Sequence, residues 1–167
     1  MGFFVKIKLF LSICFLLFGA AGCTKPEYRT QKSALIVMKT PSWSYADMGF
    51  IYENEKELKV EIYSLGKALM SLEINKENIC LSRFECMDKK SFNTKVLSPY
   101  YPDTLLEDIF RSKTIFEKQG WAAERNGFTQ NIFQKGQYDI KYTVFNQRIY
   151  FRDKMNGILI KIKKQQR

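Results

Sequence analysis

The feature that most constrains the fold is an alternation of polar and apolar residues that persists through most of the chain. Residues Lys59–Tyr63 read Lys-Val-Glu-Ile-Tyr, so successive side chains of an extended strand point to opposite faces. Short separators such as Lys135-Gly136 and Asn146 contain residues that accept positive φ at little cost. The pattern therefore predicts antiparallel strands joined by hairpins.

About ten strands are expected. Their ranges are 34–39, 43–52, 59–63, 68–74, a hairpin around Cys80, 121–125, 128–134, 138–145, 148–153 and 158–163. Two short helices interrupt them: Asp88 can cap one over 89–96, and Pro102-Asp103 opens another over 104–111. We predict a mainly β fold with a strongly curved antiparallel sheet, a half-open barrel, and the helices across its concave face. Two packed antiparallel sheets are the alternative.

The N-terminus reads as a membrane-targeting leader. Lys6 and Lys8 precede an apolar run over residues 9–18 that is too short to span a bilayer comfortably. Ala20-Ala21-Gly22-Cys23 then resembles the lipobox of bacterial lipoproteins, with Ala20 where leucine is usual. The resemblance implies a diacylglycerol thioether on Cys23 and cleavage before it. An ordinary secretory signal and an uncleaved anchor helix are the alternatives.

Three regions follow from this interpretation. They are a signal peptide over 1–22, a lipidated polar tether over 23–33 and a single β-rich domain over 34–167. Thr24 stands where enteric bacteria need an aspartate for inner-membrane retention. By that rule of the lipoprotein family, the destination is the outer membrane, facing the periplasm.

The charge balance bears on partners. The whole chain has a formal net charge of +10, of which the leader supplies two charges, so the remainder carries +8. An exported lipoprotein rarely meets nucleic acid, so we expect no nucleic-acid partner and favour anionic lipid or an acidic partner. A generally basic proteome explains the same charge.

Two cysteines remain after Cys14 leaves with the leader and Cys23 is assigned to the lipid. Cys80 and Cys86 are six positions apart and can close a tight hairpin in an oxidising compartment. Two free thiols are the alternative. The chain contains no histidine, and two cysteines are too few for a structural zinc site, so we expect no metal.

Nothing in the sequence indicates catalysis. The absence of histidine removes the commonest general base, and no Gly-rich phosphate loop or Gly-x-Ser-x-Gly elbow is found. Asp103, Glu107 and Asp108 lie on the second predicted helix, where solvation and capping explain them. We expect neither an enzyme nor a bound cofactor.

Aromatic and aliphatic bulk is abundant, with 14 Phe, 9 Tyr and 6 Met. On a curved sheet such side chains fill a solid core or line a cavity for an apolar ligand. The segment Tyr63–Ile74, with its Leu65-Gly66 loop and its Leu-Glu-Ile ending, resembles LolB, the family of outer-membrane receptors for lipoprotein localisation. Gly127–Ile132 and the final hairpin over 149–163 are also similar to that family.

The LolB resemblance implies a half-closed barrel whose apolar hollow accepts the acyl chains of lipoproteins from a soluble periplasmic carrier and releases them into the membrane. Leu65 matches the loop leucine that in this family projects into the bilayer. Alternation of side chains gives the candidate cavity-lining residues, each of which could equally belong to a core: Phe50, Tyr52, Ile62, Leu69, Leu72, Ile132 and Tyr142. The alternative function is a non-catalytic structural or assembly lipoprotein that docks on another envelope protein.

Overall fold

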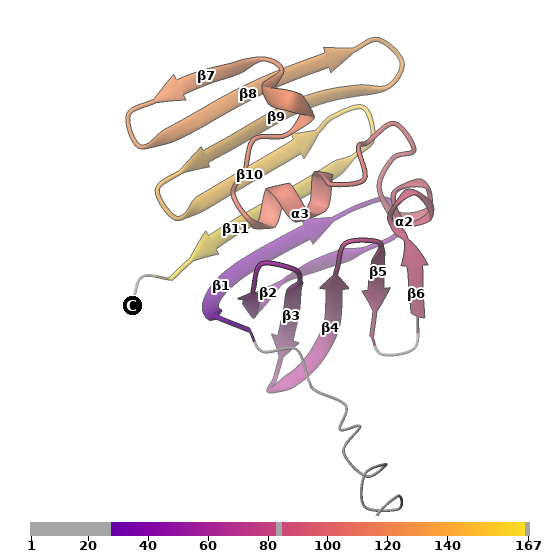
Figure 1. Ribbon diagram of the computed structural model, residues 1–167, viewed down its shortest axis with the longest axis vertical. Coiled ribbons are helices and arrows are strands. Elements are labelled where there is room, and N and C mark those ends of the chain that lie inside the picture. Colours follow the sequence, from indigo (N-terminus) through magenta and orange to yellow (C-terminus); the bar gives the residue numbers. More distant parts are fainter. Residues whose placement is uncertain (1–27, 83–84, 166–167) are drawn as a thin grey trace, which may run out of the picture.

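The structure is a computed structural model that describes residues 28–82 and 85–165. Its strands form a single antiparallel sheet of eleven strands (Figure 1). The first six are β1 (Thr30–Lys39), β2 (Ser44–Glu53), β3 (Leu58–Ser64), β4 (Lys67–Ile74), β5 (Asn78–Leu81) and β6 (Glu85–Asp88). The last five are β7 (Trp121–Glu124), β8 (Gly127–Gln134), β9 (Tyr138–Phe145), β10 (Arg148–Asp153) and β11 (Ile158–Lys164).

The sheet consists of two meanders that meet in its centre. The strand order is β6-β5-β4-β3-β2-β1-β11-β10-β9-β8-β7, so neighbours in the sheet are consecutive in the sequence except where β1 pairs with β11. In that central ladder Ala34 lies opposite Lys164 and Lys39 opposite Leu159. The sheet is not closed, because β6 and β7 remain its two edges. The prediction of one curved, half-open antiparallel sheet is confirmed, and the alternative of two packed sheets is wrong.

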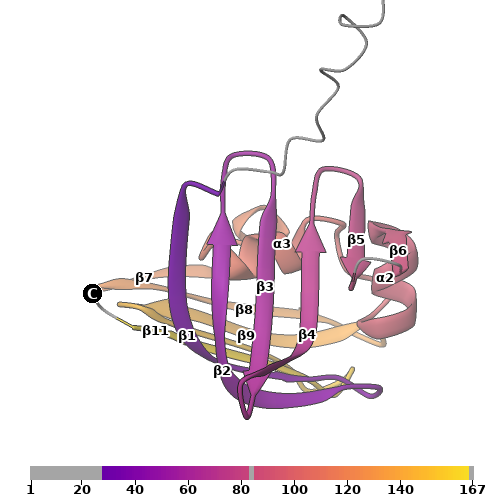
Figure 2. The ribbon, with the colours of Figure 1, turned by 90° about the horizontal axis from the view of Figure 1, so that it is seen from below.

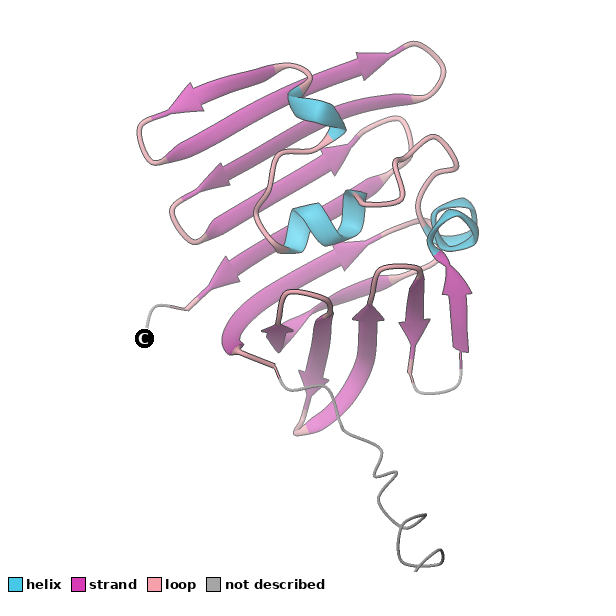
Figure 3. Cartoon of the chain, viewed as in Figure 1, coloured by secondary structure: helices cyan, strands magenta, loops and turns pink. Residues whose placement is uncertain are grey.

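Two α-helices lie between β6 and β7 in the described part of the chain. They are α2 (Lys89–Val96) and α3 (Leu105–Phe110), and a 3₁₀ turn, η2 (Phe116–Lys118), follows them. Asp88 caps α2 as predicted, because its Oδ1 accepts a hydrogen bond from the Ser91 backbone N at 2.8 Å. This segment crosses the concave face of the sheet (Figures 2 and 3).

The core lies between that concave face and the helices. Alternate strand residues point inward, and they include Ile36, Ile51, Val60, Phe151 and Ile160, each at most 1% exposed. The helical segment contributes Leu105, Leu106, Ile109 and Phe110, also at most 1% exposed. Period-two burial on the strands and one apolar face on α3 are what the sequence pattern predicts.

The predicted polar tether, over residues 23–33, overlaps the first strand of the structure. β1 begins at Thr30, which lies opposite Glu53 in β2, and the Arg29 backbone N donates to the Glu53 carbonyl oxygen at 3.1 Å. Polar residues extend this strand because its neighbour supplies partners, such as the Lys32 Nζ to Glu53 Oε1 contact of 2.5 Å. The leader, the lipobox and Cys23 lie outside the described residues.

Candidate functional site

The hairpin between β3 and β4 exposes an isolated leucine. Leu65 and Gly66 form its two-residue turn, with φ values of 49° and 77°. Positive φ is free for glycine, but it costs a leucine on the order of 1 kcal/mol or more. The Leu65 side chain is also 101% exposed. This position therefore carries an apolar side chain in water on a backbone that does not suit it.

Four of the predicted cavity-lining residues lie on the concave side of the sheet. Ile62, Leu72 and Tyr142 are 0% exposed, and Ile132 is 2% exposed. A side chain with no accessible area borders no space wide enough for a water molecule. In this structure these residues therefore belong to a filled core, the alternative that the sequence left open.

The other three candidates point away from the core, so their assignment to a cavity wall is corrected. Phe50 and Tyr52 flank Ile51, which is 0% exposed, and so they lie on the outer face of β2. Leu69 is 55% exposed and lies at an irregularity in the β3–β4 register. Because Phe50-Ile51-Tyr52 is apolar throughout, alternation alone could not decide which face is buried.

The segment over residues 89–119, which we call the lid, is fixed to the sheet by buried polar side chains. Gln130 of β8 is 0% exposed and accepts from the Ile115 backbone N at 2.9 Å. Its Nε2 donates to the carbonyl oxygens of Ile115 and Gln119 at 2.8 and 2.9 Å. One amide therefore satisfies three backbone groups of the lid, a role that the sequence pattern did not reveal.

Two further side chains of the sheet hold the middle of the lid. The Tyr142 hydroxyl donates to the Lys113 carbonyl oxygen at 2.9 Å. Lys164 Nζ donates to the carbonyl oxygen of Phe110 at 3.2 Å and to Ser112 Oγ at 3.0 Å. Burial, reinforced by the charge of Lys32, lowers the pKa of the Lys164 ammonium.

A buried carboxylate holds the loop between α2 and α3. The Tyr101 hydroxyl donates to Asp153 Oδ2 at 2.5 Å, and the backbone N atoms of Asp139, Met155 and Asn156 donate to Asp153 Oδ1. Burial acts to raise the pKa of Asp153, but the hydrogen bonds from Tyr101, Asn156 and the backbone outweigh it, so this pKa lies below its ordinary value. Burial and the adjacent carboxylate raise the pKa of Tyr101.

Ion pairs border the lid at its helical end. Glu107 contacts Lys89 Nζ at 3.2 Å and Arg111 Nε at 3.0 Å. Arg111 also donates to the Glu57 carbonyl oxygen at 3.2 Å, which ties α3 to the start of β3. Burial raises the pKa of Asp108, the neighbouring carboxylate. Within residues 28–82 and 85–165 no group of three or more His, Cys, Asp or Glu side chains could hold a metal ion.

The structure joins Cys80 and Cys86 in a disulfide. The two residues lie directly opposite each other in the β5–β6 hairpin, with a Cα–Cα distance of 3.9 Å. β6 leads straight into the Asp88 cap of α2, so the bridge lies just before the lid begins.

No known protein family matches the sequence of this chain, and no curated protein matches it either. In the described part of the chain, no helix is both long enough and apolar enough to cross a membrane.

Proposed function

We propose that this protein is an outer-membrane-anchored, LolB-like lipoprotein that accepts acyl chains between its sheet and its lid and inserts lipoproteins into the membrane. The observation that carries the proposal is Leu65, with its fully exposed side chain and its left-handed backbone. A turn selected for stability alone would use Asn or Gly at this position. A leucine side chain at this position is stabilised only when an apolar environment covers it, and the interior of a bilayer provides one.

The lid explains how a filled core can accept an acyl chain. Leu105, Leu106, Ile109 and Phe110 cover the concave face. An acyl chain that replaces them exchanges one apolar contact for another, so the net change in free energy is small. The lid is also held by hydrogen bonds to side chains of the sheet, and water can replace these when the lid lifts.

The lipobox resemblance supplies the anchor in this proposal. Tyr28, the first described residue, comes five positions after Cys23. A lipid on Cys23 would therefore hold the domain close to the membrane, with Leu65 at the end of β3 away from Thr30 and Glu53. A soluble periplasmic carrier would bring the cargo.

The second candidate function is that of a structural or assembly lipoprotein that docks on another envelope protein. The complete burial of Ile62, Leu72 and Tyr142 favours it, because a core that never opens has no place for an acyl chain.

Uptake of a fluorescent fatty acid by the chain from Thr24 onward separates the two functions. We expect stoichiometric binding. Tyr142→Phe should take up the probe about fivefold faster, because it removes a hydrogen bond from the lid worth about 1 kcal/mol. Tyr63→Phe is the matched control: Tyr63 lies on the outer face of β3 and its hydroxyl donates to Glu61 Oε2 at 2.8 Å, so loss of this hydrogen bond, away from the lid, should leave the uptake rate equal to that of the wild type. Absence of uptake in all three proteins would favour the second candidate.

A further inference from the structure

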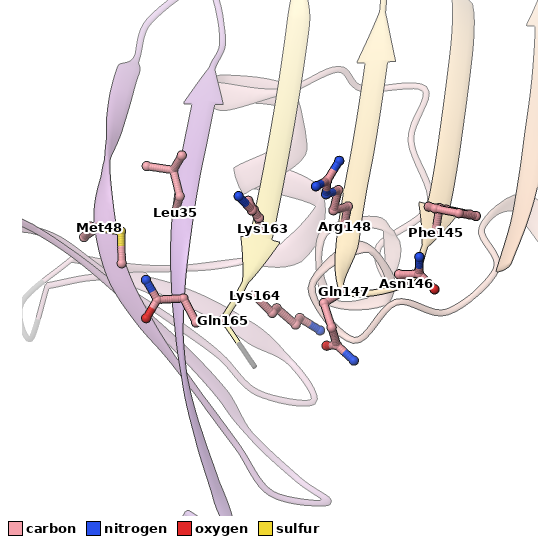
Figure 4. A pocket seen from close by; sticks show the side chains of 9 residues that line it. All are labelled: Leu35, Met48, Phe145, Asn146, Gln147, Arg148, Lys163, Lys164 and Gln165. Carbon is pink, nitrogen blue, oxygen red and sulfur yellow. The ribbon is translucent and has the colours of Figure 1, made fainter. Parts of the chain in front are cut away.

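An open hollow lies on the outer face of the sheet, on the side away from the lid. It encloses about 850 Å³, and its lining includes Leu35, Met48, Phe145, Arg148 and Lys163 (Figure 4). It shares Gln147 and Gln165 with a second hollow beside Tyr28. It shares Leu35, Arg148 and Lys163 with a third, which adds Tyr150 and Lys161. These hollows form one continuous surface, which we call the outer groove.

Large apolar side chains are exposed along the outer groove. Leu35 is 43% exposed, Met48 38% and Phe145 41%. They come from β1, β2 and the end of β9, so strands from both meanders bring them together. Apolar side chains that gather on one surface of a sheet indicate a surface that something covers.

On the strands beside Leu35 and Phe145 the charge is almost entirely positive, whereas Glu61, opposite Phe50 at the other end of the groove, pairs with Lys59 at 2.8 Å. On β9, β10 and β11 the outward-facing cations are Lys141, Arg148, Arg152, Lys161 and Lys163. The only outward-facing acid on these three strands is Asp139, which lies 3.7 Å from Lys154. No carboxylate in the described part of the chain forms an ion pair with any of the five cations. The complementary surface is therefore anionic.

The start of the described chain lies against the same face. Tyr28 packs on Tyr52, with ring centroids 5.7 Å apart, and Tyr52 lies on the outer side of β2. Cys23 comes five residues earlier, and five residues span at most about 18 Å. A lipid on Cys23 would therefore keep this face, rather than the lid, next to the bilayer. This step rests on the proposed lipid anchor, whereas the charge and the apolar side chains do not.

We propose that the outer groove docks on an anionic lipid surface. Arg148, Lys161 and Lys163 contact lipid phosphates, while Leu35, Met48 and Phe145 enter the boundary between headgroups and acyl chains. Lipid is favoured over an acidic protein as the occupant because exposed apolar residues on both sides of Lys163 and Arg148 match a headgroup boundary, and because the chain leaves this face towards its anchor.

Sedimentation with vesicles tests this docking on the chain from Thr24 onward, without a lipid. All described strands and helices lie within residues 28–165, so this chain keeps the whole fold. We expect binding to phosphatidylcholine vesicles that contain phosphatidylglycerol, weakened by salt, and little binding to phosphatidylcholine alone. The double variant Lys161→Gln, Lys163→Gln should bind about 25-fold more weakly, since each basic residue near the surface contributes about fivefold to the affinity.

The matched control removes the same charge from the lid side. Lys90→Gln, Lys95→Gln alters two exposed lysines of α2 and should bind the anionic vesicles like the wild type. Leu65→Glu should keep the dependence on phosphatidylglycerol, which separates this docking from the proposed role of the hairpin. Equal losses in the two lysine pairs, indifference to phosphatidylglycerol, or absence of vesicle binding would each overturn the proposal, even if an acidic protein bound the groove. Failure of fatty-acid uptake would leave it standing.

Discussion

At the scale of single residues, Leu65 combines a structural cost with a proposed use. Its φ of 49° lies in the left-handed region, which asparagine tolerates better than leucine. Leu65→Asn should therefore raise the free energy of unfolding by about 0.5–1 kcal/mol. Urea unfolding measures this change. Leu69→Asn is the matched control, because Leu69 is an exposed leucine whose φ is not positive. This substitution should not raise the free energy of unfolding.

The same Leu65→Asn protein tests the function in cells that carry it as their only copy. If the tip inserts into the bilayer, the more stable variant should deliver fewer lipoproteins to the outer membrane, as judged by fractionation. Normal delivery would remove the membrane role of Leu65. A loss of stability would show that the side chain packs against the fold.

Asp153 makes the stability of the fold sensitive to acid. Its folded pKa lies below the unfolded value of about 3.9, so the ionised carboxylate contributes stability above about pH 4. That contribution is lost as the pH falls through the lower folded pKa. Asp153→Asn should cost about 2–3 kcal/mol at neutral pH and should flatten the acid limb of a plot of unfolding free energy against pH.

Urea unfolding at a series of pH values checks this prediction. The control is Asp103→Asn, which changes an exposed carboxylate of the lid and should alter neither the neutral stability nor the acid limb. An acid limb of unchanged slope in Asp153→Asn would show that other carboxylates govern the acid sensitivity.

At the scale of elements, the β5–β6 hairpin is short and lies at the edge of the sheet, so it has fewer neighbouring strands to stabilise it than a central hairpin. The Cys80–Cys86 disulfide stabilises it instead. Because the bridge closes a small loop, the double variant Cys80→Ser, Cys86→Ser should lose less than the roughly 3 kcal/mol associated with a 15-residue loop. Thermal melting measures the loss. Two alkylatable thiols in periplasm-expressed wild type, seen by mass spectrometry without reduction, would contradict the bridge.

Elements with strong local signals could be predicted from the sequence. Helix α2 has the predicted bounds because Asp88 supplies a cap, and β9 and β10 agree because hairpin turns delimit them. Gly127 shows the limit of such signals. It falls in the gap between the predicted strands 121–125 and 128–134, where a turn residue is expected, yet it lies in β8 without a positive φ, and an added Cβ would lie 1.8 Å from the Val144 carbonyl oxygen. A single sequence gives no signal for a glycine that is required by a close approach between two strands.

The candidate site was predictable only in part. Leu65 could be found because hairpin spacing places it in a turn, where its own strands cannot cover it. Gln130 could not be found, because its partners, Ile115 and Gln119, lie in an irregular segment. Whether Ile62 and Tyr142 border a cavity depends on how the lid packs against the sheet. The number of bulky side chains in the sequence does not predict that packing.

At the scale of the whole molecule, the order of the two meanders follows from sequential hairpins, but their junction does not. The β1–β11 ladder joins residues that are far apart in the chain, and period-two alternation is the same whichever strand is the partner. The sequence therefore predicted an open curved sheet without indicating which strands form its centre and which form its edges.

That central ladder has a consequence for how the chain acquires its structure. Ala34 cannot pair with Lys164 until β11 is available. The first meander must therefore either fold alone or stay unfolded while the second is synthesised or translocated. Closing such a long loop lowers the conformational entropy of the chain before the β1–β11 contacts can stabilise it. We therefore expect this junction to form in a slow step of folding. Until then, the inward-facing Ile36 and Ile160 of the two unpaired strands are open to aggregation. A chain of this topology would gain from a chaperone that holds it unfolded until its last strand arrives.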